Sequence, residues 1–450
     1  MIEDPNRILL ASIKRLLRRG AFPYLRKIVH KTHAADLSVV FRSLSVTYQH
    51  KLFNMIDSAE KRGIILSEMD TDAFQVLIEG MEIKDIVHIL MHMPTDDVAD
   101  LIGQMPPDIS ESILTRMKPE GLDEVKDLLR FKDDTAGGIM NPDFIALKEN
   151  TTARQAVESL QKEHLDVEMP FYLYVVDDEG RLMGVSSLRQ LVVVPPDTPL
   201  KKLMTTDVFS VRTDMDQEEV AKIVARYDIL AVPVVEEDNR LVGIVTVDDV
   251  IDIFRHEATE DMLKMAGAGE EFVETKSVFK STRMRLPWLF ASCVGGVIAF
   301  FIIGYFETSL TKITSLAAFI PVIMGMGGNI GTQSATIVVR GLATNRLHTG
   351  DLWKVVAKEL SIGMILGMVY GTMIGSVAHL RYSVMALGAV VSLAVLSSMT
   401  IAALVGSFIP MILARFNVDP AIATGPFVTT SIDIISVSFY FIIATLFLGV

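Results

Sequence analysis

A single acidic residue stands inside the last apolar stretch of the chain. Asp433, in VTTSIDIISVSF (residues 428–439), is the only charged residue after Asp419. A carboxylate within a membrane is costly, and it usually faces a cavity or a partner. Because no Lys or Arg lies at a matching depth in any apolar stretch, two interpretations remain, a protonated acid or a carboxylate that binds a cation. We favour the cation.

Oxygen ligands could surround such a cation. The second apolar stretch contains PVIMGMGGNIGTQSAT (residues 321–336), a run of glycines, amides and hydroxyls that includes Gly328, Asn329 and Thr332. Small residues alone would indicate close helix packing, but this polar run also offers a wall that can replace a cation's water. Neither Cys nor His stands beside Asp433. A hard divalent ion such as Mg²⁺ therefore suits the site better than a soft metal.

The charge is divided unevenly along the chain. The 450 residues carry a net charge of −13, yet residues 288–450 hold seven Lys/Arg against five Asp/Glu. The first 287 residues therefore hold 35 basic and 50 acidic side chains, a net charge of −15. This acidic half argues against nucleic acid as a partner, since nucleic acid is bound through basic contacts to phosphate. It suits cation binding or simple solubility. The single cysteine, Cys293, excludes internal disulfides and Cys-cluster metal sites.

Five apolar stretches have roughly the length of a membrane span, about 20 residues. They occupy 288–306, 314–339, 359–380, 384–414 and 421–449. With a cytoplasmic N-terminus, seven Lys/Arg flank the spans on the inner side and two on the outer side, as the positive-inside rule requires. No signal peptide opens the chain. We expect a multi-pass protein of a bacterial-type cytoplasmic membrane, embedded in the lipid bilayer, with Val450 outside. Since five spans are too few to surround a pore, the cation site would lie between two copies.

The soluble half contains two kinds of repeat. Residues 1–131 have helical periodicity with Met-Pro pairs at 93–94 and 105–106, which predicts short stacked helices; an ordinary helical bundle is the alternative. Further along, 140–160 resembles 204–224, and 172–192 resembles 230–250. Each copy predicts a β-α-β-β-α unit, and two such units would bury each other's sheets.

The longer repeats resemble a tandem CBS pair, and that resemblance implies binding of adenine nucleotides or other small effectors. The second copy has the complete ribose-binding pattern of that family in Gly243, Thr246 and Asp249, whereas Gln190 replaces the acid in the first copy. The resemblance therefore implies an ATP-type regulatory site that is impaired on one side. Its candidate contacts are Tyr172, Tyr174, Arg189, Thr246 and Asp249.

The expected fold is that of a multidomain membrane protein: an α-helical superhelical N-terminal domain, α/β tandem CBS domains, a connecting plug helix and a five-helix transmembrane domain. The expected boundaries are 1–131 for the cytosolic helical domain, 132–197 and 198–254 for the two CBS units, 255–286 for the connecting helix and 287–450 for the transmembrane domain.

This combination, with GGNIGTQSAT and Asp433 as its most specific motifs, resembles the MgtE family of magnesium channels and transporters over essentially the whole chain. The resemblance implies a homodimer whose central pore binds hydrated Mg²⁺ between two copies of Asp433. It also implies that the connecting helix plugs the pore when cytosolic Mg²⁺ is high. No obligatory protein partner is evident.

The resemblance further implies a set of cytosolic regulatory ligands. They are Asp96, Asp100, Gly138 through its carbonyl, Asp214, Glu218, Asp228, Asp249, Asp252, Glu257, Glu260, Asp261 and Asp419. Two positions depart from the family pattern, since Ile64 stands in place of an acid and Gly425 in place of an asparagine near the pore mouth.

The acids from Asp249 to Asp261 recur at helical spacing with little base between them. Like charges at that spacing weaken a helix by a few tenths of a kcal/mol each. A solvated acidic face is one explanation, but bound cations explain five acids leading into a pore better. Mg²⁺ would draw the acidic faces together and favour a closed state, and its loss would let them repel.

We therefore expect a channel that imports Mg²⁺, is closed by cytosolic Mg²⁺ and is driven by the ion gradient and the membrane potential. No phosphate-binding loop suggests an ATP-driven pump, and no nucleophile–base pair or metal–His cluster suggests an enzyme. Three alternatives remain: a membrane-anchored nucleotide sensor without transport, a broader Co²⁺, Ni²⁺ or Ca²⁺ channel, and an anion channel. The polar spans lack basic residues, which argues against the anion channel.

Overall fold

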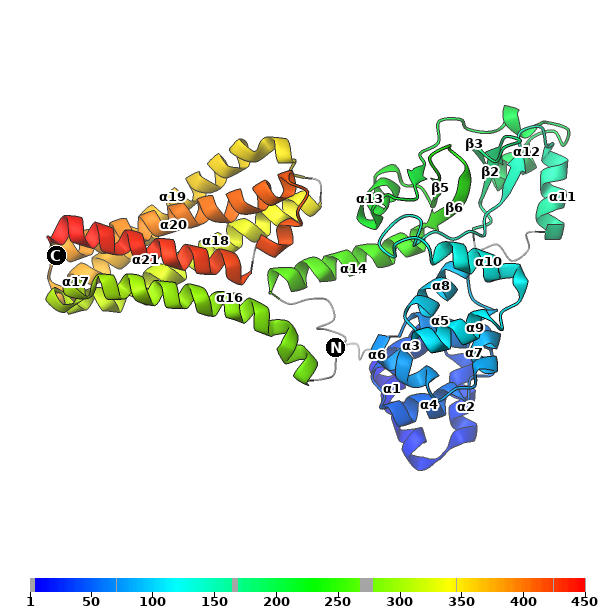
Figure 1. Ribbon diagram of the computed structural model, residues 1–450, viewed down its shortest axis with the longest axis horizontal. Coiled ribbons are helices and arrows are strands. Elements are labelled where there is room, and N and C mark those ends of the chain that lie inside the picture. The colour runs from blue at the N-terminus through cyan, green and yellow to red at the C-terminus, as the bar shows by residue number, and fades with distance from the viewer. Residues whose placement is uncertain are drawn as a thin grey trace. The chain divides into compact units, whose positions relative to one another are not determined.

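The computed structural model describes residues 5–69, 71–163, 169–267, 278–344, 346–423 and 425–449. The chain forms two compact units, Met1–Glu257 and Ala258–Val450, whose elements are labelled in Figure 1. The first unit, called the soluble unit below, contains most of the acidic half of the sequence. The second contains the apolar half and the polar run around Asn329.

Short helices build the N-terminal part of the first unit (Figure 1, blue to cyan), which confirms the predicted helical domain. Proline sets their boundaries: Pro94 and Pro106 are the N-caps of α8 and α9, where a residue without an N–H group does no harm. The helices are α1 (Pro5–Arg19), α2 (Phe22–Lys31), α3 (Ala34–Arg42), α4 (Val46–Phe53), α5 (Ala59–Ser67), α6 (Thr71–Ile78), α7 (Ile83–Leu90), α8 (Thr95–Gly103), α9 (Pro107–Leu114) and α10 (Pro119–Leu128).

The rest of the first unit confirms the predicted repeat. The described residues form one sheet of order β1-β2-β3 and another of order β4-β5-β6, each with a parallel pair followed by an antiparallel pair. The elements are β1 (Ala146–Lys148), α11 (Ala153–Glu163), β2 (Tyr172–Val176), β3 (Leu182–Ser187), α12 (Leu188–Val193), the 3₁₀ helix η1 (Leu200–Lys202), β4 (Val211–Arg212), α13 (Gln217–Tyr227), β5 (Ala231–Val235) and β6 (Leu241–Thr246).

Two cores hold these parts together. Tyr174 and Leu182 of the first repeat pack with Val235 and Leu241 of the second, so the two repeats do bury each other's sheets. A larger core runs from the N-terminal helices into the second repeat as far as Ile253. The N-terminal helices and the second repeat therefore share one interior.

The connecting segment was expected over 255–286. Helix α14 (Val247–Met265) ends two residues before Gly267, whose positive φ of 70° favours glycine. Helix α16 (Val278–Tyr305) then runs without a break through Pro287. Residues 278–286, which were expected in the connecting helix, are continuous with the first apolar helix. Residues 268–277 of that expected helix lie outside the described residues.

In the second unit, the described residues include five helices long and apolar enough to cross a membrane, as predicted. They are the elements drawn from yellow-green to red in Figure 1. After α16 come α17 (Glu307–Lys312), η2 (Thr314–Phe319), α18 (Ile320–Ala343), η3 (Thr349–Asp351), α19 (Leu352–Tyr382), α20 (Met385–Arg415), η4 (Pro420–Ala423) and α21 (Pro426–Leu448).

Glycine brings α19 and α20 close together. Gly363, Gly367, Gly371 and Gly375 follow one another at four-residue intervals and are all buried. A β-carbon on Gly371 would lie 2.6 Å from the Ser392 carbonyl oxygen, so no larger residue fits there. Small residues at such spacing let membrane helices approach backbone to backbone.

Candidate cation pathway and regulatory sites

The carboxylate of Asp433 faces the backbone of α18. Asp433 is half-buried in α21, and a β-carbon placed on Gly328 would lie 3.9 Å from its Oδ1 atom. No described residue gives this carboxylate a hydrogen bond or an ion pair. An intramembrane acid without an internal partner is a functional position by default.

Polar side chains gather on one exposed face of α18. Asn329 and Thr332 are exposed, whereas Gly331 and Ser334 are buried against neighbouring helices. The Thr332 Oγ1 atom donates a hydrogen bond to the Gly328 carbonyl oxygen, 2.9 Å away. The Asn329 amide has no hydrogen-bond partner among the described residues. This face therefore offers amide and hydroxyl oxygens next to the position of the carboxylate.

Other polar residues of α21 serve packing instead. The Ser436 Oγ atom lies 2.7 Å from Ser398 Oγ of α20, and that hydroxyl also lies 3.1 Å from the Ile323 carbonyl oxygen of α18. All of these atoms are buried. The serines thus join three helices behind Asp433, and Thr430 likewise packs against Gly295 of α16. The sequence alone does not distinguish these packing residues from a candidate cation contact such as Thr332, because all of them are hydroxyls in apolar helices.

The arrangement suits a cation that keeps its water. Within the described ranges, no group of three or more His, Cys, Asp or Glu side chains could hold a metal ion. A dehydrated site is therefore not built from this chain's acids alone. Mg²⁺ gives up water reluctantly and is often held through one or two carboxylates. One carboxylate beside a wall of amide and hydroxyl oxygens fits that chemistry.

A basic residue holds two of the predicted regulatory acids together. The Lys264 Nζ atom of α14 lies 2.7 Å from Asp419 Oδ2 and also forms an ion pair with Glu260 one turn earlier. Although partial burial lowers the pKa of Lys264, its hydrogen bonds to Asp419 and Glu260 outweigh this and raise it. The other Asp419 oxygen accepts from the Ala421 N–H, 2.8 Å away. The end of α14 is thus tied to the segment that leads into α21.

The same contact explains the departure at Gly425. Gly425 is buried, and a β-carbon there would lie 3.1 Å from the Met265 carbonyl oxygen and 3.3 Å from the Gly267 nitrogen. Glycine lets the end of α14 lie against the start of α21. A larger side chain at this position would have to displace that end.

The soluble unit brings several predicted acids near one another. Asp100 of α8 reaches solvent at the rim of this group, with Asp133 and Asp249 nearby. Partial removal from water, together with the charges of Asp133 and Asp249, raises the pKa of Asp100 to about 6. Burial likewise raises the pKa of Asp249. Gly138 belongs to the same region, since a β-carbon on it would lie 3.0 Å from the Asp133 Cα atom.

Asp133 was missed by sequence analysis. It precedes the DTAGG stretch by one residue, and the acidic pair Asp133–Asp134 was the available signal. Crowding of carboxylates at raised pKa is typical of a cation site or of a functional cluster. Asp96 lies deeper, 9% exposed, and its Oδ1 atom accepts a hydrogen bond from the Asn141 amide at 3.3 Å.

The remaining predicted acids make local contacts of their own, although Asp252 also lies near Asp249. Asp214 pairs with Arg212 (3.0 Å), Glu218 with Lys222 (2.8 Å) and Asp252 with Arg255 (3.2 Å). The other three lie elsewhere on their helices: Asp228 caps α13 in the left-handed conformation, Glu257 accepts from the Gln217 amide at 2.7 Å, and Asp261 follows Glu260 on α14. Ile64, the departure from the family's acid, is exposed on α5.

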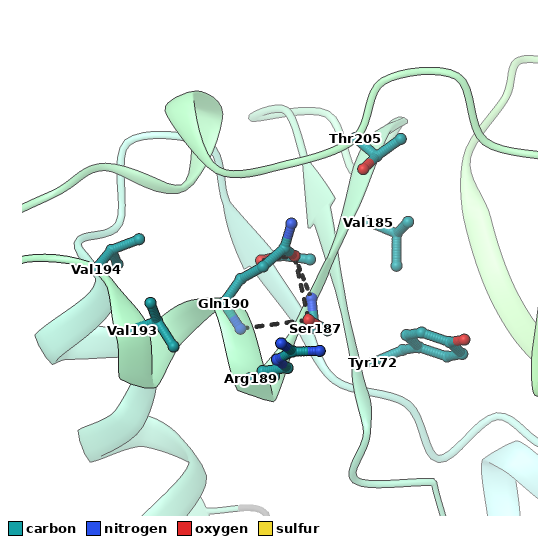
Figure 2. A pocket seen from close by; sticks show the side chains of 9 residues that line it. Tyr172, Val185, Ser187, Arg189, Gln190, Val193, Val194 and Thr205 are labelled. Carbon is teal, nitrogen blue, oxygen red and sulfur yellow. Dashed lines mark hydrogen bonds between the residues drawn. The ribbon is translucent and has the colours of Figure 1, made fainter.

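A cavity of about 500 Å³ lies beside β3 and α12. Figure 2 shows Tyr172, Arg189 and Gln190 among the side chains that line it. The Gln190 Oε1 atom already accepts from the Ser187 N–H at 2.8 Å, and its amide nitrogen donates to the Leu203 carbonyl at 3.4 Å. The glutamine therefore closes a helix cap and has little capacity left for a ribose.

The other candidate nucleotide contacts lie elsewhere. Tyr174 is 1% exposed, packs edge-on against Phe144 and does not line the cavity, so its predicted nucleotide contact is corrected to a core position. Its hydroxyl has no hydrogen-bond partner within the described part of the chain. In the second repeat, Thr246 Oγ1 donates to Asp249 Oδ2 at 2.6 Å, which caps α14 as Gln190 caps α12. Thr246 and Asp249 also lie outside the residues that line the cavity.

Comparison with known proteins supports the same division of the chain. Residues 320–443 match the model of the divalent cation transporter family MgtE, 32–134 match the MgtE intracellular N domain, and 136–197 and 200–256 match CBS domains. The magnesium transporter MgtE of Bacillus subtilis is 35% identical over 434 residues, 96% of each chain. The magnesium transporter MgtE of Thermus thermophilus is 39% identical over 328 residues, 72% of each chain.

Two solved structures resemble the soluble part. One is the cytosolic domain of the Mg²⁺ channel MgtE in complex with ATP, with a TM-score of 0.52 and 34% identity, covering 54% of this chain and 99% of the other. The second is the soluble part of a magnesium transporter, with a TM-score of 0.50 and 32% identity, covering 56% of this chain and 99% of the other.

Asp100→Asn should change how the stability of the fragment 1–257 depends on pH. The folded-state pKa of Asp100, about 6, is raised above its ordinary value of 3.8, so its contribution to the free energy of unfolding is fully present below 3.8 and is lost as the pH rises from there to about 6. We expect the wild-type fragment to lose melting temperature between about pH 4 and pH 6.5, about 1–5 °C of it through Asp100. The variant should lose less. An identical pH dependence in both proteins would contradict the grouping of these acids.

Lys264→Met should loosen the end of α14. Loss of both ion pairs is expected to raise amide hydrogen exchange at Ala421 by about three- to tenfold, since half-buried pairs contribute on the order of 1 kcal/mol. Mass spectrometry of the full-length protein in detergent would measure it. Lys222→Met is the matched control, because within the described ranges Lys222 forms an ion pair only with Glu218 of its own helix, at 2.8 Å. Unchanged exchange at Ala421 in the first variant would contradict the tie.

Proposed function

This chain belongs to the MgtE family of magnesium transporters, and on that premise we propose that it is a channel that conducts Mg²⁺ into the cytoplasm past Asp433. The observation that carries the proposal is the half-buried Asp433 carboxylate, which faces Gly328 and has no partner among the described residues. A passing cation supplies the charge that the helices do not.

We further propose that two copies form the pathway. The face of α18 with Asn329 and Thr332 is exposed in one chain, although polar side chains are costly against lipid. A second copy would cover this face and bring a second Asp433 opposite the first. Two carboxylates facing one axis match the charge of a hydrated divalent ion. The amides and hydroxyls would then contact its water shell.

Closure by cytosolic Mg²⁺ is the regulatory part of the proposal. Asp100, Asp133 and Asp249 form a crowded acidic group in the soluble unit, and Glu260 and Asp419 form another near α21. Mg²⁺ would relieve the repulsion in each and favour the state in which the acids are close. Lys264 already supplies one positive charge at Glu260 and Asp419. The repulsion expected from the sequence on loss of Mg²⁺ is therefore partly neutralised there.

A nucleotide such as ATP is a candidate regulatory ligand, not an energy source. The cavity lined by Tyr172 and Arg189 offers an aromatic ring and a guanidinium to a base and a phosphate chain (Figure 2). Gln190, engaged in its helix cap, would contribute little to holding a ribose. The cytosolic domain of a relative was solved with ATP. We expect this chain to bind nucleotide more weakly than a relative with an acid at that position.

The orientation follows from charge. We propose that the N-terminus and soluble unit lie in the cytoplasm and that Val450 lies outside, because Lys and Arg gather on the flanks that this topology places inside. The membrane would be the cytoplasmic membrane of a bacterial cell. A broader divalent channel that also admits Co²⁺, Ni²⁺ or Ca²⁺ is the second candidate. A site that contacts the water shell of an ion rather than the ion itself distinguishes ionic radii poorly.

Asp433→Asn should lower Mg²⁺ uptake into proteoliposomes by about tenfold or more, the size expected when a charged ligand is lost. A fluorescent Mg²⁺ indicator inside the vesicles would report the flux. Asp351→Asn is the matched control, because this acid begins α19 outside the polar face of α18. Flux near that of wild type in Asp433→Asn would refute the pathway and favour a nucleotide sensor without transport.

Removal of residues 1–270 should leave a pathway that no longer closes. The truncated protein lacks every acid of the soluble unit and also Glu260 and Lys264. Mg²⁺ can therefore no longer bind the closed state more tightly than the open state through these acids. We expect its vesicle uptake to be independent of Mg²⁺ on the soluble-unit side, while full-length protein is inhibited. If the truncated protein is still inhibited from that side, closure does not depend on these acids.

A further inference from the structure

Glu359 is a buried acid that the cation pathway does not use. It lies in α19 with 4% of its surface exposed, and Ser334 Oγ of α18 donates a hydrogen bond to its Oε2 atom at 2.9 Å. Among the described residues, no Lys, Arg or His forms an ion pair with it. The sequence placed Glu359 at the start of a span, but α19 begins at Leu352, two turns earlier. The acid is therefore inside the helix bundle.

The glycines of α19 fix the direction of this side chain. Glu359 stands four residues before Gly363, in the same stripe that continues through Gly367 and Gly371. Residues four apart lie on one face of a helix. Because those glycines contact α20 backbone to backbone, Glu359 is held toward the interior and cannot turn to the lipid or to water without moving α19.

Ser334 lies on the back of the pore-facing helix. It is 1% exposed, and it stands two residues from both Thr332 and Thr336, which are exposed. Two residues turn an α-helix by about 200°. The hydroxyl that bonds Glu359 thus points away from the polar face of α18. A contact on this side sets the rotation of the face that meets the ion.

Two buried polar contacts join α18 to its neighbours: Ser398 of α20 donates to the Ile323 carbonyl oxygen at 3.1 Å near the start of the helix, and Ser334 bonds Glu359 further along. One turn earlier, Gly331 is in contact with the Ile432 side chain of α21, and a β-carbon there would lie 3.4 Å from the Ala402 carbonyl oxygen of α20. These contacts are apolar or steric, so they resist approach but do not select one rotation. The Ser334–Glu359 hydrogen bond is directional and joins α18 to α19.

We propose that Glu359 is a positioning residue for the ion pathway: through Ser334 it holds α18 in the rotation that presents Gly328, Asn329 and Thr332 beside Asp433. This inference rests on the proposed function as a Mg²⁺ pathway. Glu359 does not touch the ion. Its loss lets α18 rotate, and the oxygen wall then meets the hydrated ion in several arrangements instead of one.

The test is Mg²⁺ uptake into proteoliposomes for full-length wild type, Ser334→Ala, Glu359→Ala, Glu359→Gln and the Ser334→Ala/Glu359→Ala double variant. We expect each alanine variant to raise the half-saturating Mg²⁺ concentration by about fivefold or more, as for a lost hydrogen bond to a charged group. Glu359→Gln keeps an acceptor for Ser334 and should stay within about twofold of wild type. The double variant should be no worse than the worse single one, since both remove one contact.

Ser407→Ala is the matched control, because Ser407 is fully buried in α20 and, among the residues that the structure describes, its hydroxyl bonds only carbonyls of its own helix. It should leave half-saturation unchanged. If wild type takes up Mg²⁺ but the alanine variants keep its half-saturation, or if the two losses simply add, the positioning role is overturned while the pathway stands. If wild type takes up no Mg²⁺, the proposed function fails and this inference fails with it. Because Ser334→Ala deletes one oxygen only, it tests the contact even if Glu359→Ala does not fold.

Discussion

One constraint organises the membrane unit: a carboxylate must stay in an apolar bundle without an internal counter-charge. Asp433 faces the α18 backbone at Gly328, where no side chain stands between the carboxylate and the helix. Burial of an isolated charge is unfavourable, so the geometry is useful only with a cation present. The buried serines behind Asp433 and the glycine contacts of α19 with α20 hold the helices that define this space.

The proposed regulation would use the same chemistry, the attraction of carboxylates to a divalent ion. Acids in the soluble unit and at the end of α14 are crowded enough to respond to a divalent ion, but most of the predicted ones are already paired with a base or used as helix caps. Lys264 shows that a side chain can take the place of a cation between Glu260 and Asp419. In the proposed regulation, a divalent ion would therefore compete with Lys264 for these two acids.

The sequence was enough to predict the domain order, the repeated β-α-β-β-α units and five apolar helices, because each depends on local periodicity. The isolated charge of Asp433 and the polar run around Asn329 also stand out locally. Contacts between distant segments were not predictable. Lys264 and Asp419 are 155 residues apart. Tyr172 and Tyr174 stand two apart on β2 and so point to the same face, yet Tyr172 lines the cavity and Tyr174 lies in the core.

The central claim is that Mg²⁺ passes Asp433 and closes its own path from the soluble-unit side. Patch recording from the reconstituted wild-type protein, with Mg²⁺ varied independently on each face, tests both halves at once. The account predicts an inward Mg²⁺ current that persists when Mg²⁺ is raised on the Val450 side and shuts off when it is raised on the side of the soluble unit. No Mg²⁺ current under either condition, or a current indifferent to the side on which Mg²⁺ is added, would contradict it.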